Sequence, residues 1–239
     1  MKKKVWKWLL GILIFLLAAV SLMVVVVKNK EYQPSDMAVS ASQDSSIVDN
    51  VIRFEGDNNK PKVIFYPGAL VEPASYSIWA QKVAQAGYSV YIVHFPLDLA
   101  VLNSNAADKI SKNNGYVIGG HSLGGTMAAK YAKNNPNDLK GLFFLASYPE
   151  NKNDLHEINV PVLSLTATKD GVLNHTNYQK TKKLLPNNTI YEQIKGGNHA
   201  SFGSYGKQSG DNAATISNAK QQNIISTLLI NWLNDSISE

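Results

Sequence analysis

Three side chains of the types that nucleophilic catalysis needs occur along the chain in the order serine, aspartate, histidine. Ser122 lies in the motif Gly-His-Ser-Leu-Gly at residues 120–124, directly after an apolar run and before residues with helical spacing. This context is typical of a nucleophile elbow, a strained turn that exposes a serine at the start of a helix. There the helix dipole and free N–H groups favour developing negative charge. The motif alone is also typical of an ordinary glycine-rich turn, so its context has to decide.

A serine hydroxyl needs a base to become a nucleophile, and the base needs a third group to orient it. We predict His199 as the base, because it follows the last predicted strand on a glycine-bearing loop. Asp170 follows another predicted strand, so it faces the same rim of the sheet as the elbow. Asp98 and Asp211 are rival acids, but the order Ser122, Asp170, His199 is the one expected with this elbow.

Acyl transfer also needs N–H donors that stabilise an oxyanion. One is the backbone N–H of Leu123, the residue directly after the serine. The second is expected in the loop after Tyr66, where Ala69 follows Pro67-Gly68. We therefore predict an oxyanion hole formed by Leu123 and Ala69. His121, next to the serine, is expected to pack the elbow.

The elements that position these residues alternate between strand and helix. Short apolar, β-branched and aromatic runs predict strands, and apolar residues at helical spacing predict helices. The strands are predicted at 47–54, 62–66, 88–95, in the run before the elbow, and at 139–146, 160–166 and 189–194. The helices are predicted at 75–86, 105–113, after the elbow, and at 178–185 and 213–233. Such alternation implies an α/β fold with a mainly parallel sheet covered by helices on both faces.

The first residues do not have a globular composition. Lysines at positions 2, 3, 4 and 7 precede an apolar run over residues 8–27, long enough to cross a bilayer. A cleaved signal peptide is the alternative, but the run is longer than usual and ends without a small-x-small site. We expect an uncleaved membrane anchor at 1–28, a flexible linker at 29–46 and a catalytic domain at 47–239. The lysine distribution predicts that this domain is extracytoplasmic.

The loop between the strands at 139–146 and 160–166 is too short for a helical lid, so we expect an open site with an apolar rim. The predicted rim residues are Leu70, Phe95, Leu97, Tyr148, Val172 and Phe202. No metal or organic cofactor is implied. The net charge of +5 comes partly from the lysines that flank the apolar run, and no basic stripe with interleaved aromatic residues indicates nucleic-acid binding.

From about residue 47 to 239 the sequence resembles the α/β-hydrolase superfamily, especially its small single-domain members similar to dienelactone hydrolases. The resemblance rests on residues 67–69, 120–125, 168–170 and 196–199. It implies an eight-stranded or slightly reduced sheet and a Ser–Asp–His triad. Pro67 stands where many relatives have histidine. Dienelactone hydrolases proper have cysteine where this chain has Ser122, so their substrate is not carried over.

Together these features predict a membrane-anchored serine hydrolase, most simply a carboxylesterase that acts on small or short-chain acyl esters. A tethered binding module that keeps the fold without the activity is one alternative. A cell-envelope amidase or peptidase is another, although it would be expected to have a longer lid or an acidic subsite. The fold alone does not decide among these functions.

Overall fold

The computed structural model describes residues 2–57, 59–112 and 115–237. The chain divides into two units, residues 1–31 and 32–239. The first unit consists of helix α1, Lys2–Lys28. By length and composition, Trp8–Lys28 is a candidate membrane span, a property that signal sequences share.

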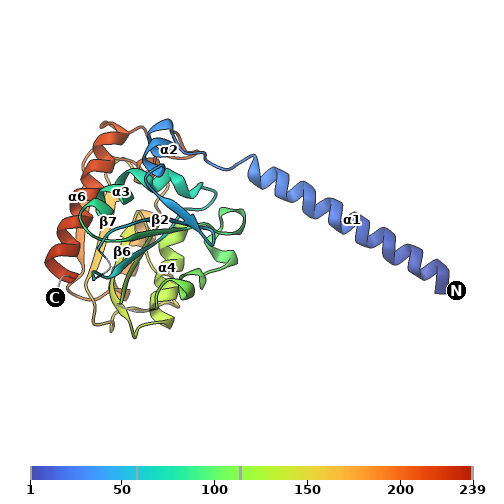
Figure 1. The fold of residues 1–239 in the computed structure, drawn as a ribbon, viewed down its shortest axis with the longest axis horizontal. Helices are drawn as coiled ribbons and strands as arrows, with labels where there is room; N and C mark the ends of the chain where they lie inside the picture. Colours follow the sequence, from blue (N-terminus) through green and yellow to red (C-terminus); the bar gives the residue numbers. More distant parts are fainter. Residues whose placement is uncertain (1, 58, 113–114, 238–239) are drawn as a thin grey trace. The chain divides into compact units, whose positions relative to one another are not determined.

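The second unit is built on an eight-stranded sheet with the order β1-β2-β4-β3-β5-β6-β7-β8 (Figure 1). Strands β3 to β8 run parallel, and β1 and β2 are antiparallel at one edge. The strands are β1 Ser46–Val48, β2 Val51–Phe54, β3 Lys62–Tyr66, β4 Val90–Val93, β5 Tyr116–His121, β6 Leu139–Leu145, β7 Val162–Ala167 and β8 Ile190–Ile194. Because parallel strands end at the same edge, the loops after β3, β5, β7 and β8 meet there.

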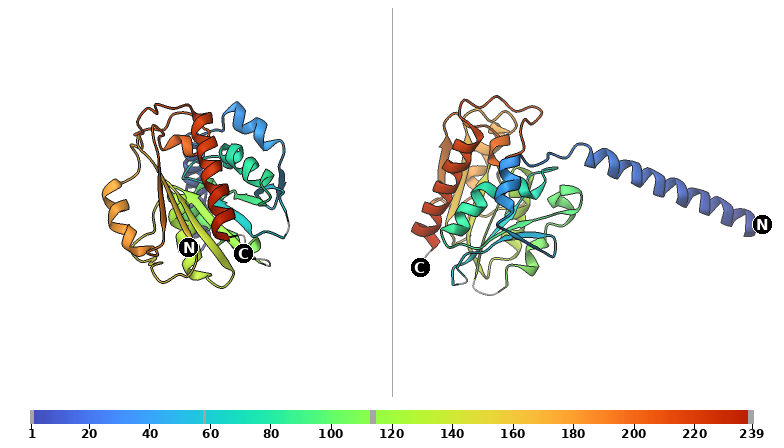
Figure 2. Two further views of the ribbon diagram at one scale, coloured as in Figure 1. Left: turned by 90° about the vertical axis from the view of Figure 1, so that its left-hand side faces the viewer. Right: turned by 45° about the horizontal axis from the view of Figure 1, so that its top comes forward.

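Helices cover both faces of the sheet (Figure 2). Their bounds are α2 Asp36–Ser42, α3 Ser77–Gln85, α4 Leu123–Asn134, α5 His175–Thr181 and α6 Asn218–Ile237. Alternate residues of each central strand enter different cores, as the period of a strand requires. Phe65 and Phe143 pack with α3 and α6, whereas Tyr66 and Phe144 pack with α4. The predicted α/β fold is confirmed.

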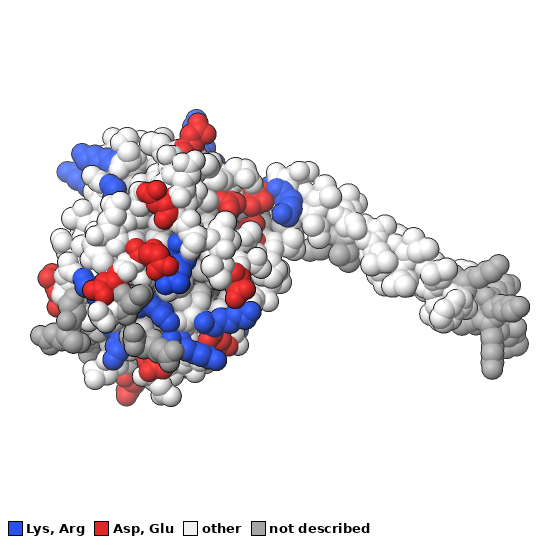
Figure 3. All heavy atoms as spheres, viewed as in Figure 1, with Lys and Arg blue, Asp and Glu red and all other residues white. Residues whose placement is uncertain are grey.

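Charged side chains of both signs are interspersed on the face of the domain drawn in Figure 3. This distribution is that of an ordinary solvated surface, on which neighbouring charges of opposite sign limit the net field.

The single strand predicted at 47–54 is a hairpin instead. Its two strands, β1 and β2, are joined by Asp49 and Asn50, which have φ values of 51° and 61°. Two consecutive positive φ values define the tight turn whose twist matches paired strands, and Asp and Asn tolerate them well. The Asp-Asn pair is the signal that the sequence analysis missed.

The helix predicted at 105–113 is also wrong over its described residues. Over its described residues, the crossover from β4 to β5 contains three short 3₁₀ turns, Pro96–Asp98, Ala100–Leu102 and Ala106–Lys109, and no α-helix. The hydroxyl of Tyr66 accepts the Ala107 N–H at 3.0 Å and donates to the Ser104 carbonyl at 3.0 Å. These bonds hold the backbone in turns, and the polar residues 103–105 favour turns over a helix interior. Residue 113 lies outside the described residues.

The segment predicted to be a flexible linker contains the short helix α2, which packs on α3. The hydroxyl of Ser35 caps α2 by accepting the Ala38 N–H at 3.3 Å. Ala38 is the only buried residue of α2, whereas Met37 and Val39 are exposed. With one small buried side chain, the segment has no apolar periodicity that sequence analysis could detect.

Candidate active site

Ser122 stands between β5 and α4 with φ 51° and ψ −124°, a strained conformation for a residue with a side chain. Its N–H donates to the carbonyl of Leu145 at 3.0 Å, and its own carbonyl accepts the Ser147 hydroxyl at 2.5 Å. Gly120 and Gly124 allow this geometry, because a Cβ at either position would overlap backbone atoms packed against it. The predicted strand–turn–helix context of Ser122 is therefore present.

Asp170 and His199 are in direct contact. The distance from His199 Nδ1 to Asp170 Oδ2 is 2.8 Å, and both residues are buried. The other carboxylate oxygen, Oδ1, accepts the N–H groups of Val172 at 2.9 Å and Leu173 at 2.8 Å. The carboxylate is thus fixed from both sides, and it orients the imidazole through Nδ1.

Burial by itself would raise the pKa of Asp170, but its partners outweigh burial and lower the pKa. The hydrogen bond and positive charge of His199 contribute most to the lowering, followed by the N–H groups of Leu173 and Val172. These contacts therefore favour the charged carboxylate form of Asp170.

The structure does not join Ser122 to His199. Among the described residues, the Ser122 hydroxyl has no hydrogen-bond partner, and the buried Nε2 of His199 also has none. Buried polar atoms are usually satisfied, so the Nε2 of His199 can accept a further hydrogen bond. Hydrogen bonds between catalytic groups are often long in the absence of substrate.

The rival acids have other partners. Asp98 Oδ1 lies 3.2 Å from Nε2 of His94, away from the Asp170–His199 pair. Asp211 bridges the two loops that carry that pair, because its carboxylate accepts the N–H of Gly171 at 3.0 Å and of Ala200 at 2.8 Å. Sequence analysis considered Asp211 only as a triad acid and missed this bridging role.

A second histidine lies beside the first. The rings of His121 and His199 have centroids 4.4 Å apart, and Phe202 stacks on His121 at 5.7 Å. The Tyr76 hydroxyl accepts the Gly68 N–H at 3.0 Å and lies 2.9 Å from His121 Nδ1. Since no other described acceptor faces this hydroxyl, it donates to Nδ1, and the proton of neutral His121 is on Nε2.

The pKa of His121 is held well below its usual value, first by burial and second by the neighbouring charge of His199. The carbonyl of His199 acts in the opposite direction, although His121 Nε2 makes no hydrogen bond of normal geometry. The site therefore holds His121 in its neutral form.

The two predicted oxyanion donors have free N–H groups. Neither Ala69 nor Leu123 donates a backbone hydrogen bond to any described residue. Ala69 lies in the loop Pro67–Glu72, hereafter the oxyanion loop, and Gly68 in the same loop is held by Tyr76. The next residue, Leu70, has φ 58°, and its N–H donates to the Asp98 carbonyl at 2.9 Å. The sequence analysis did not predict these contacts, which hold the oxyanion loop in place.

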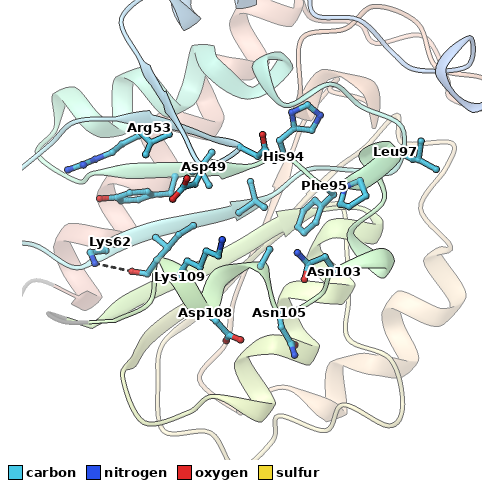
Figure 4. Close-up of a pocket in the computed structure, with 18 residues that line it drawn as sticks. Asp49, Arg53, Lys62, His94, Phe95, Leu97, Asn103, Asn105, Asp108 and Lys109 are labelled. Atoms are coloured by element: carbon cyan, nitrogen blue, oxygen red, sulfur yellow. Dashed lines mark hydrogen bonds between the residues drawn. The ribbon is translucent and has the colours of Figure 1, made fainter. Parts of the chain in front are cut away.

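The predicted rim residues lie in several places. Phe95 and Leu97 line a cavity of about 760 Å³, bounded by the β1–β2 hairpin, β4 and the turns at 100–109 (Figure 4). Ser122, Asp170 and His199 do not line this cavity, so we do not treat it as the reaction site.

The other rim residues have structural contacts of their own. Leu70 lies next to the predicted oxyanion donor Ala69. Tyr148 is half-buried, and its carbonyl accepts the Thr126 hydroxyl at 3.0 Å. Val172 supports Asp170 through its N–H, and Phe202 is fully buried against His121.

Among the described residues, no group of three or more histidine, cysteine, aspartate or glutamate side chains is arranged to hold a metal ion.

Residues 62–223 match the model of the alpha/beta hydrolase family, and the chain belongs to this family. It is thus classed as a hydrolase. No curated protein sequence matches the chain.

Several solved structures share the fold. A carboxylesterase from Bacillus subtilis is 12% identical, with a TM-score of 0.62, over 90% of this chain and 99% of that one. A dienelactone hydrolase from Anabaena variabilis is 14% identical, with a TM-score of 0.59, over 78% of this chain and 91% of that one. A monoacylglycerol lipase from Paleococcus ferrophilus is 14% identical, with a TM-score of 0.55, over 76% and 98% of the two chains. At these identities the likeness establishes the fold alone.

Proposed function

We propose that the protein is a serine hydrolase that cleaves small carboxylic esters through an acyl-enzyme. The observation that carries this proposal is the buried Asp170–His199 pair, whose Nε2 is unpartnered, on the same rim as the strained elbow serine. In serine hydrolases with this type of elbow, a carboxylate holds Nδ1 of the histidine, and Nε2 of the same ring activates the serine.

In the proposed reaction, Ser122 Oγ attacks the ester carbonyl while His199 Nε2 takes its proton. Asp170 keeps Nδ1 protonated and stabilises the imidazolium that forms. The oxyanion is held by the N–H groups of Ala69 and Leu123. Collapse of the tetrahedral intermediate expels the alcohol, which receives the proton from His199. Water, activated by the same imidazole, then releases the acid and restores Ser122.

We further propose that α1 anchors the chain in the membrane with the catalytic domain on the extracytoplasmic side. The apolar helix and the lysines that precede it support this topology. Proteolysis of intact cells or protoplasts would degrade an external domain and spare a cytoplasmic one. A mature chain that lacks residues 1–28 would instead identify α1 as a cleaved signal sequence.

The first experiment is labelling of the full chain in detergent with a fluorophosphonate, which reacts with activated serines. Wild type is compared with Ser122→Ala and His199→Ala, and with Ser147→Ala as a matched control, because Ser147 is the nearby serine that supports the elbow carbonyl. Labelling is expected in wild type and Ser147→Ala and not in the other two. A folded wild type that is not labelled would refute the proposal and favour the binding module.

A panel of p-nitrophenyl esters and matching anilides separates the enzymatic alternatives. An esterase is expected to hydrolyse the short esters far faster than the anilides. Preference for anilides or peptides would instead support the amidase or peptidase.

A further inference from the structure

We propose that residues Tyr32–Ser35, hereafter the strap, position the two loops on which the proposed reaction depends. The strap holds the oxyanion loop on one side and the segment after His199 on the other. It starts four residues after Lys28, the last residue of α1, inside the segment that the sequence predicts to be a linker. The inference rests on the proposed hydrolase function, since it assigns Ala69 as an oxyanion donor.

The strap pairs with the oxyanion loop through its main chain. Tyr32 donates its N–H to the Leu70 carbonyl at 2.7 Å, and its own carbonyl accepts the Glu72 N–H at 3.1 Å. The two bonds form a parallel bridge between Tyr32 and Val71. The two bonds are therefore made by Leu70 and Glu72, which flank Val71 and lie one and three residues after Ala69.

The bridged loop is strained and needs these contacts. Leu70 has φ 58°, a left-handed conformation that is unfavourable for a residue with a side chain. Such a conformation persists only where the surroundings over-determine it. Here the Leu70 carbonyl is held by Tyr32, and its N–H is held by the Asp98 carbonyl at 2.9 Å. Loss of the Tyr32 bond would free one side of Leu70 and allow the neighbouring Ala69 N–H to turn.

The strap also contacts the segment after His199. Ser35 donates its N–H to the Ser204 carbonyl at 2.7 Å, and the two hydroxyls are 2.7 Å apart. The ring of Tyr32 lies against that of Tyr205, with centroids 5.3 Å apart. The strap therefore contacts residues five and six positions beyond the proposed base.

The two segments that the strap contacts are also connected to each other by hydrogen bonds. Ser204 also donates its N–H to the carbonyl of Ser75, which is next to Tyr76, the residue that holds Gly68 and His121. The oxyanion loop and the segment after the base are thus linked twice within the second unit, once through Tyr76 and once through the strap. A displacement of about 1 Å in a catalytic group can lower the rate about 100-fold, so loss of such a link is expected to slow the proposed reaction.

The test uses the full chain in detergent with Tyr32→Pro, which removes the N–H that bonds Leu70. Gln33→Pro is the matched control, because the Gln33 N–H donates no hydrogen bond to a described residue and its side chain is exposed. Tyr32→Phe keeps the main-chain bridge and the ring, so it serves as the conservative variant. The kcat and KM are measured on p-nitrophenyl acetate, and the final extent of fluorophosphonate labelling counts the folded active sites.

We expect Tyr32→Pro to lower kcat per labelled site about 10- to 100-fold with KM changed far less, as for a displaced oxyanion donor. Gln33→Pro and Tyr32→Phe are expected to keep nearly the wild-type kcat. An unchanged kcat per labelled site in Tyr32→Pro overturns the inference, even if fewer sites are labelled, because a merely structural role reduces the number of sites and not their rate. A wild type without labelling or turnover refutes the proposed function instead.

If Tyr32→Pro does not fold, Ser35→Ala tests the inference instead. It removes the hydroxyl contact with Ser204 and also the cap of α2, and counting kcat per labelled site separates any loss of folded protein from a change in rate. Ser42→Ala is its control, because the Ser42 hydroxyl bonds only to the Val39 carbonyl within α2. One hydrogen bond of about 1 kcal/mol corresponds to roughly a 5-fold lower kcat per labelled site. Equal kcat values per labelled site for Ser35→Ala and Ser42→Ala would overturn the inference that the strap positions these loops.

Discussion

Replacing Asp170 by asparagine keeps the shape of the side chain and removes its charge. The asparagine oxygen can still accept the N–H groups of Val172 and Leu173, which leaves its NH₂ group facing Nδ1 of His199. Two donors cannot bond to each other, so Nδ1 becomes the unprotonated nitrogen and the proton moves to Nε2. The base then presents a proton to Ser122 where it should accept one. We expect kcat to fall about 10³- to 10⁴-fold, equivalent to roughly 4–5.5 kcal/mol in the barrier.

The same change should cost much less in stability. Asp170 makes three hydrogen bonds as a charged acceptor, and a charged acceptor is worth about 1 kcal/mol more per bond than a neutral one. With two of the three bonds retained in weaker form and the third reversed in direction between neutral groups, the expected loss is about 1–3 kcal/mol. For a domain of this size that lowers Tm by about 2–12 °C. The variant should therefore be folded and inactive.

The assay is hydrolysis of p-nitrophenyl acetate, with Tm measured on the same samples. Asp211→Asn is the control, because Asp211 also accepts backbone N–H groups on these loops but has no bond to the His199 ring. It should lose less than about tenfold in kcat. The reasoning is refuted if Asp170→Asn retains more than a tenth of the wild-type kcat, or if Asp211→Asn falls as far.

Three further changes test the packing around the site. Gly124→Ala places a Cβ on the carbonyl oxygen of Tyr66, and chemical denaturation should show a loss of more than about 3 kcal/mol in unfolding free energy. Tyr76→Phe strands the buried Gly68 N–H and His121 Nδ1, so it should lose about 2–4 kcal/mol in the same measurement and also lower kcat. Because the folded-state pKa of His121 is depressed, the unfolded chain takes up a proton below about pH 6.5 that the native state does not. Unfolding free energy should therefore fall from pH 6.5 to 5, and His121→Gln should flatten that slope; an equally steep slope in the variant would contradict this pKa.

Much of the sheet could be predicted because its strands are short apolar runs bounded by turns. The run Lys62–Tyr66 matches β3 in both bounds, and the runs that form β6, β7 and β8 are correct to within two residues at each end. The final helix begins at Asn218 instead of 213, since the residues before it are tied to the Gly196 loop by the Thr215 N–H. The hairpin and the 3₁₀ crossover were missed because turn residues and one tyrosine hydroxyl, not apolar periodicity, determine them.

In the candidate site, too, some features were predicted from the sequence and others were not. Chain order and position after strands select Asp170 and His199, and the structure brings these two together. The contact between Ser122 and His199 stays a prediction. The supports of the site were not visible in the sequence, because Tyr32 acts through its main chain and Asp211 through backbone N–H groups, and neither interaction leaves a residue pattern.

The neutral state of His121 connects the acid–base chemistry to the oxyanion loop. With Nδ1 unprotonated, His121 accepts from the Tyr76 hydroxyl, whose oxygen then accepts the Gly68 N–H. A proton on Nδ1 would turn that nitrogen into a donor, and the Tyr76 oxygen would face two donors while its own hydrogen lost its acceptor. Burial prevents this by lowering the pKa of His121. In the proposed reaction, the ring next to His199 therefore stays uncharged when His199 takes the serine proton, and Gly68, next to the proposed oxyanion donor Ala69, stays in place.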